Sequence, residues 1–70
     1  MHDVCTYQIE VRGQVDENDL NTMSPLQMTM VRTDPMATLI TVCADQSGLV
    51  GLTRHLHGRG FVLLSLHRDV

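Results

Sequence analysis

Apolar and polar side chains alternate over residues 5–12, which is the period-2 pattern of a strand with one buried face. Residues 26–33 also alternate, and residues 37–43 are rich in β-branched side chains. An Asp-Pro turn signal separates these two segments and predicts a hairpin. A last apolar run over residues 61–67 predicts a fourth strand.

One longer segment has the period of a helix. Asp45 stands at the position of an N-cap, and Leu49, Leu52 and Leu56 follow at the spacing of one helical face. Gly58 and Gly60 are both suited to a left-handed C-cap after the last turn. The sequence therefore predicts a main helix that begins after Asp45.

The polar segment 16–25 predicts a short helix or a loop. Asp16 is a candidate N-cap, and Leu20 and Met23 would then face inward at i, i+3 spacing. Pro25 ends the segment in either case.

The element order is therefore strand, short helix or loop, strand, strand, helix, strand, in one small α+β domain over residues 1–70. This order is that of a ferredoxin-like fold with a reduced first helix, whose mainly antiparallel four-stranded sheet has the spatial order 4-1-3-2. A pairing that sets Cys5 opposite Cys43 would turn Leu39 toward the helix. Ile40 and Val42 would then lie on the other face of the sheet.

A single main helix is too small to cover a four-stranded sheet, so the sequence predicts apolar side chains without a cover. Such a patch exceeds what a monomer normally exposes. We therefore expect a homodimer that buries the uncovered face or pairs sheet edges; the alternative is that the segment 16–25 of the same chain folds over this face. The residues expected at this interface are Ile40, Val42, Val62, Leu64 and Leu66.

Composition excludes several classes of function. The 70 residues carry a net charge of −3, all five basic residues other than histidine are arginines, and Tyr7 and Phe61 are the only aromatic residues. This balance argues against a nucleic-acid surface. No apolar run is long enough for a membrane helix, and the first residues show no cationic leader, so we expect a cytoplasmic protein with two free thiols.

The residues that could carry chemistry form no recognisable constellation. His55 and His57 diverge by about 200° on a helix, which is unlike the i, i+4 pair of helical metal sites. Cys43 lies shortly before the main helix but has no evident base beside it. We therefore expect no catalytic, cofactor-binding or metal-binding residues. The alternative is a small enzyme completed at the dimer interface, which would use residues such as Tyr7, Arg54, His55, His57 and His67.

Three short motifs together resemble a set of short bacterial proteins of unknown function, over about residues 7–68. Where these proteins have aromatic residues near 19–23, this chain has Leu20 and Met23. The resemblance supports the α+β element order and implies no activity. The motifs are Tyr7-x-Ile9-x-Val11-x-Gly13, Asp45-Gln46-x-x-Leu49-x-Gly51-Leu52 and Gly60-Phe61-x-Leu63-Leu64-Ser65-Leu66.

The function that best fits these features is a non-enzymatic interaction module. We expect a small cytoplasmic homodimer that binds a protein partner or a small ligand, with no nucleic acid and no membrane among its partners.

Overall fold

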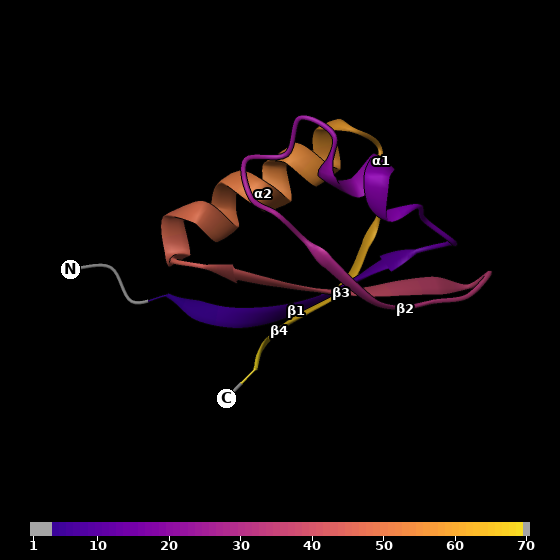
Figure 1. The fold of residues 1–70 in the computed structure, drawn as a ribbon, viewed down its shortest axis with the longest axis horizontal. Coiled ribbons are helices and arrows are strands. Elements are labelled where there is room, and N and C mark those ends of the chain that lie inside the picture. Colours follow the sequence, from indigo (N-terminus) through magenta and orange to yellow (C-terminus); the bar gives the residue numbers. More distant parts are fainter. Residues whose placement is uncertain (1–3, 70) are drawn as a thin grey trace.

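The computed structural model describes residues 4–69, so the expectation about the chain's first residues lies outside the described part. Four strands form one sheet, and two helices form a layer on one face of it (Figure 1). In chain order these are β1 (Cys5–Arg12), α1 (Glu17–Asn21), β2 (Thr29–Thr33), β3 (Ala37–Ala44), α2 (Gln46–Gly58) and β4 (Leu63–Asp69).

The sheet confirms the predicted α+β class. Its strand order is β2-β3-β1-β4, and all three neighbouring pairs are antiparallel. Read from the β4 end, this is the expected order, with β1 and β3 at the centre. The departure from a regular ferredoxin-like arrangement lies between β1 and β2, where α1 has only five residues.

The predicted pairing of β1 with β3 was wrong by one residue. Cys5 lies opposite Ala44, and Ile9 lies opposite Ile40. Side chains alternate between the faces of a strand, so a slip of one residue reverses the whole face. Ile40 and Val42 consequently point toward the helices, where they are 0% and 3% exposed, and they are not part of an uncovered face.

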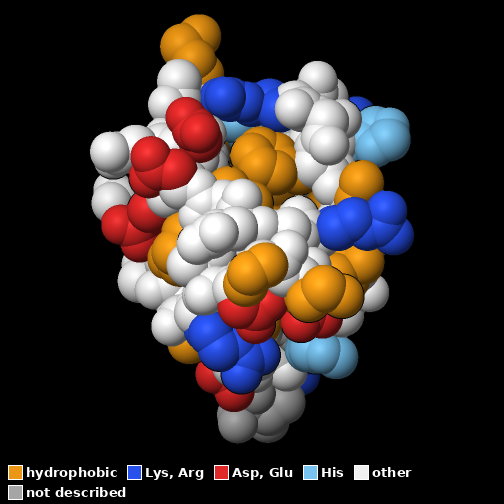
Figure 2. All heavy atoms as spheres, turned by 90° about the vertical axis from the view of Figure 1, so that its right-hand side faces the viewer, with side chains coloured by type: hydrophobic (Ala, Val, Ile, Leu, Met, Phe, Trp, Pro, Cys, Tyr) orange, Lys and Arg blue, Asp and Glu red, His pale blue; other side chains and the backbone are white. Residues whose placement is uncertain are grey.

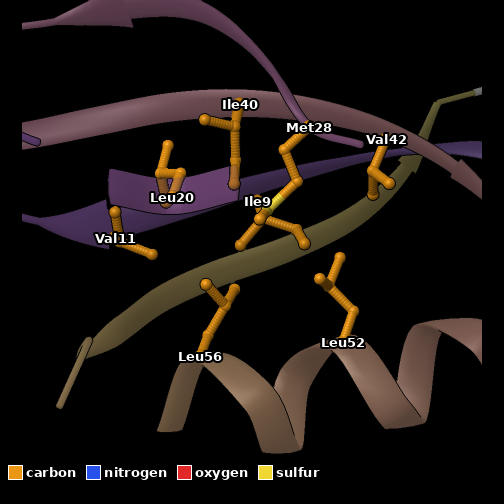
Figure 3. Close-up of a cluster of buried hydrophobic side chains, with 8 residues drawn as sticks. All are labelled: Ile9, Val11, Leu20, Met28, Ile40, Val42, Leu52 and Leu56. Carbon is orange, nitrogen blue, oxygen red and sulfur yellow. The ribbon is translucent and has the colours of Figure 1, made fainter. Parts of the chain in front are cut away.

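The core lies between the helices and the sheet (Figure 3). Leu52 and Leu56 of α2 point toward the inner face of the sheet, and Leu20 adds a side chain from α1. The spacing of the α2 leucines therefore correctly predicted the buried helical face. The core residues are Ile9, Val11, Leu20, Met28, Ile40, Val42, Leu52 and Leu56.

Both ends of α2 are capped as predicted. The Asp45 Oδ1 atom accepts the backbone N–H of Gly48 at 2.6 Å, which supplies a partner at the helix N-terminus. At the other end Gly60 has a φ of +89°, and its N–H donates to the His57 carbonyl. The Phe61 N–H donates to the Leu56 carbonyl, which completes a left-handed C-terminal motif.

The segment between β1 and β2 follows the prediction only in part. Asp16 caps α1 by accepting the Asn18 N–H at 3.1 Å, and Leu20 is fully buried. Met23, which was expected to face inward, is 89% exposed and has a φ of +60°. The reason is that the helix ends at Asn21, so the i, i+3 relation between positions 20 and 23 is lost.

Strand β2 begins at Thr29, three residues later than predicted. The Asn21 side chain donates to the Met28 carbonyl at 2.9 Å and accepts the Met28 N–H at 2.7 Å. Both backbone groups of Met28 are therefore bound by a side chain of α1. Met28 is 1% exposed and belongs to the core.

A buried hydroxyl joins the β2–β3 hairpin to the chain that follows β1. Thr38 is 0% exposed, and its Oγ1 atom donates to the Gly13 carbonyl at 2.8 Å. The same oxygen accepts the Val15 N–H at 3.2 Å and lies 2.7 Å from the Thr33 Oγ1 atom. This network satisfies a polar group inside the fold and holds the bend after β1 in place.

The turn between β2 and β3 is sensitive to pH through Asp34. Its carboxylate accepts the N–H groups of Met36 and Ala37, and these bonds, with a smaller contribution from Arg32, lower the pKa of Asp34. Because the folded-state pKa lies below the unfolded one, the stabilisation is present above the unfolded pKa and is lost as pH falls through the folded pKa.

We therefore expect protonation of Asp34 to lower the free energy of unfolding of the wild-type protein in acid. The Asp34→Asn variant keeps a hydrogen-bond acceptor but does not titrate, so it should lack this part of the acid destabilisation. Urea unfolding at pH 7 and pH 3 measures the difference. An equal loss of stability in both proteins between these pH values would contradict the role of Asp34.

Candidate functional site

The side chains expected to carry chemistry do not come together within one chain. Arg54, His57 and His67 are exposed, while Tyr7 and His55 are half-buried. His67 lies opposite Gln8, on the face of the sheet that points away from the helices, whereas His55 and His57 belong to α2. Over residues 4–69 there is no group of three His, Cys, Asp or Glu side chains arranged to hold a metal ion.

His55 has one unusual feature. Its Nε2 atom is buried and makes no hydrogen bond with any residue in the described part of the chain. The other histidine of α2, His57, is exposed. The buried nitrogen is therefore isolated and forms no pair with another titratable group.

The two cysteines lie on opposite faces of the sheet. Cys43 is exposed on the face away from the helices, where its Sγ atom is 3.6 Å from the Thr6 Oγ1 atom. Cys5 is half-buried and lies opposite Ala44. Both thiols are free, and because they lie on opposite faces of the sheet they cannot form a disulfide with each other within the chain.

The face of the sheet away from the helices is mostly polar. On β1 it carries Thr6, Gln8, Glu10 and Arg12, because the alternate residues Ile9 and Val11 are buried under the helices. β3 adds Ala37, Leu39, Thr41 and Cys43 to this face, by their register with β1. A face of this composition does not require an apolar cover.

The predicted interface residues therefore separate into two groups. Ile40 and Val42 belong to the core, whereas Val62, Leu64 and Leu66 are 46%, 45% and 42% exposed. Leu64 and Leu66 belong to β4, and Val62 directly precedes it. On the end of the molecule shown in Figure 2, apolar side chains form separate spots among polar and charged ones.

Side chains of α1 bind backbone groups at the start of the β2 edge of the sheet. The Glu17 Oε2 atom accepts the Met30 N–H at 2.8 Å, and Asn21 binds both backbone groups of Met28. β2 also has a bulge at Val31, but β4 has one at Leu64, so the bulges do not distinguish the two edges. Binding of edge backbone groups by side chains is one way in which a sheet edge is kept from pairing with another chain.

Sequence reasoning missed Glu17 and Asn21 as edge-capping residues. Their backbone partners lie 13 and 7 residues away along the chain, so no local pattern could have indicated them.

The opposite edge is open. β4 has seven residues, contains neither proline nor lysine, and pairs only with β1. Over residues 4–69, its backbone groups that face away from β1 have no hydrogen-bond partner. We call this outward side of Leu63–Asp69, together with the preceding Val62, the β4 edge. A bulge leaves Leu64 without a residue opposite it on β1.

Comparison with known families gives a match over most of the chain. A sequence model described as a domain of unknown function, DUF8691, matches residues 6–67. The chain belongs to this family. The DUF8691 match agrees with the expectation of a protein that has no assigned function. Comparison with curated proteins and with solved structures found no match.

The DUF8691 chain contains no helix in residues 4–69 that is long and apolar enough to cross a membrane.

Proposed function

We propose that this DUF8691 protein is a non-enzymatic interaction module that functions as a homodimer and binds a protein partner or a small ligand in that form. The observation that carries the proposal is the β4 edge, where an unpaired strand coincides with exposed Val62, Leu64 and Leu66. Exposed strand edges of this kind bind other strands through backbone hydrogen bonds.

The open β4 edge favours pairing of sheet edges over contact between sheet faces. Ile40 and Val42 are used in the core of one chain, and the face away from the helices is mostly polar. The edge is thus the best-supported contact surface for a homodimer.

A bacterial source and a cytoplasmic location belong to the same proposal. The source follows from the resemblance to short bacterial proteins. Both cysteines are free and the Cys43 thiol is exposed, which supports a cytoplasmic location because free thiols persist in reducing compartments.

We expect sedimentation velocity and light scattering to detect a species of twice the 7.8 kDa chain mass, in reversible equilibrium with the monomer. Measurements from about 1 μM to 1 mM cover the range of weak and moderate association. A single 7.8 kDa species over the whole range would overturn the homodimer.

Ligand binding is tested separately with a thermal-shift screen of small metabolites and with immobilised protein as bait for a purified candidate partner. The control is a Leu66→Lys variant, which places a charge in the β4 edge. A ligand or partner that binds the wild type and the variant equally would show that binding does not depend on this edge.

A further inference from the structure

We infer that the β4 edge pairs with the β4 edge of a second copy of this chain, in antiparallel direction, about a two-fold axis at Ser65. This inference rests on the proposed homodimer and specifies its geometry. The two four-stranded sheets then become one continuous sheet, with the β4 strands at its centre.

The occupant that best matches the β4 edge is another strand. β4 offers a row of backbone N–H and C=O groups with no partner in the described chain. Another strand satisfies most of these groups at once, because its own donors and acceptors repeat with the same spacing. The exposed leucines at positions 64 and 66 then gain apolar neighbours across the new strand pair.

The sequence of β4 is complementary to a second copy of itself. In an antiparallel pair centred on Ser65, Leu64 lies opposite the partner's Leu66, and symmetry repeats this contact. Arg68 lies opposite the partner's Val62, so its aliphatic stem covers that side chain. No like charges face each other. The three exposed apolar residues of each copy are thus all used by one symmetric register.

Neighbouring registers are less favourable. A pair centred on Leu66 sets Leu64 opposite the partner's Arg68 and leaves one leucine pair instead of two. A pair centred on His67 sets two histidines opposite each other. A pair centred on Leu64 keeps only three residues of each β4 within the ladder, against five for the Ser65 register.

Assembly ends at two chains because a two-fold contact at one edge is closed, whereas a sheet that paired through both edges would continue to add copies. At the second edge, β2, the Glu17 carboxylate accepts the Met30 N–H, and Asn21 binds Met28 directly before the strand. The β2 edge is therefore partly blocked by α1, whereas no side chain of the described residues binds the β4 edge, and this difference favours a dimer through β4.

Cysteine cross-linking tests the register. In a Cys5→Ala/Cys43→Ser background, Ser65→Cys is expected to form an intermolecular disulfide on mild oxidation, because directly opposed residues lie about 5 Å apart between Cα atoms. His67→Cys is the matched control. In the Ser65 register its two copies are about 13 Å apart, too far for a disulfide.

These outcomes separate the register from the dimer itself. A protein that dimerises in solution but whose His67→Cys variant cross-links in place of Ser65→Cys overturns the register and leaves the proposed homodimer standing. A protein that is monomeric throughout and forms no cross-link overturns both.

Charge substitution tests which edge is used. Leu66→Lys is expected to weaken dimerisation by about tenfold or more, since a charge would be buried at the new strand pair. Val31→Lys makes the same kind of change at the β2 edge, where Val31 is 55% exposed. We expect it to leave the dimerisation constant unchanged.

Both side chains are exposed in the single chain, so neither variant should unfold it, and circular dichroism checks this. Weaker dimerisation of Val31→Lys with no effect of Leu66→Lys would assign the interface to β2 and overturn the inference.

Discussion

The Ile40→Asp variant is expected to be unfolded in neutral buffer, whereas Thr41→Asp should keep the native fold. Ile40 is 0% exposed under the helices, and a carboxylate there would have no partner in the core. Burial of an unpaired charge costs several kcal/mol. A 70-residue chain has a total stability of only about 4–10 kcal/mol.

Thr41 is the matched control because it is the next residue of β3 and points to the opposite, mostly polar face. We expect its substitution to cost about 1 kcal/mol or less. Far-ultraviolet circular dichroism and proton–nitrogen correlation spectra distinguish the two outcomes. A folded Ile40→Asp protein together with an unfolded Thr41→Asp protein would show that the pairing of β1 with β3 is shifted by one residue.

Leu52→Ala is expected to destabilise the protein by about 3 kcal/mol. Leu52 is 0% exposed and extends from α2 into the core between the helices and the sheet. Truncation removes apolar contacts and leaves a cavity that a small core cannot fill by relaxation. The loss is a third or more of the expected stability, so the melting temperature should fall by more than about 10 °C.

The matched control is Val50→Ala in the same helix, at a side chain that is 46% exposed. We expect it to change stability by about 0.5 kcal/mol or less. Urea unfolding of the two variants gives both free energies. Equal losses at positions 50 and 52 would mean that α2 does not present its leucine face to the sheet.

The strands and the main helix were predictable because their signals are local. β1 alternates cleanly, and α2 has a capping residue, a leucine face and a terminal glycine within a few turns. Each of these signals depends on neighbours in the chain. The element order, and with it the strand order, follows from such local features.

The register of β3 was not predictable for a definite reason. Leu39 and Ile40 are adjacent and apolar, so either could have faced the helices. The choice is made by contacts with β1 and α2, which are distant in sequence. The same holds for the contacts at the β2 edge, since the bonds from Glu17 and Asn21 exist only once α1 has folded beside β2.

The predicted contact surface is exposed only in part. Val62, Leu64 and Leu66 are exposed at or beside the edge strand β4, and their contact with a second chain stays a prediction. Ile40 and Val42 were wrongly assigned to the same surface because the predicted pairing of β1 with β3 was shifted by one residue.

The contact of α1 with the β2 edge has a consequence for local opening. α1 has five residues and can detach while β1 and β3, with eight residues each, stay paired. In that opened state the Met30 N–H loses its Glu17 partner and exchanges with solvent. We therefore expect a backbone group of the β2 edge to become available for pairing without global unfolding.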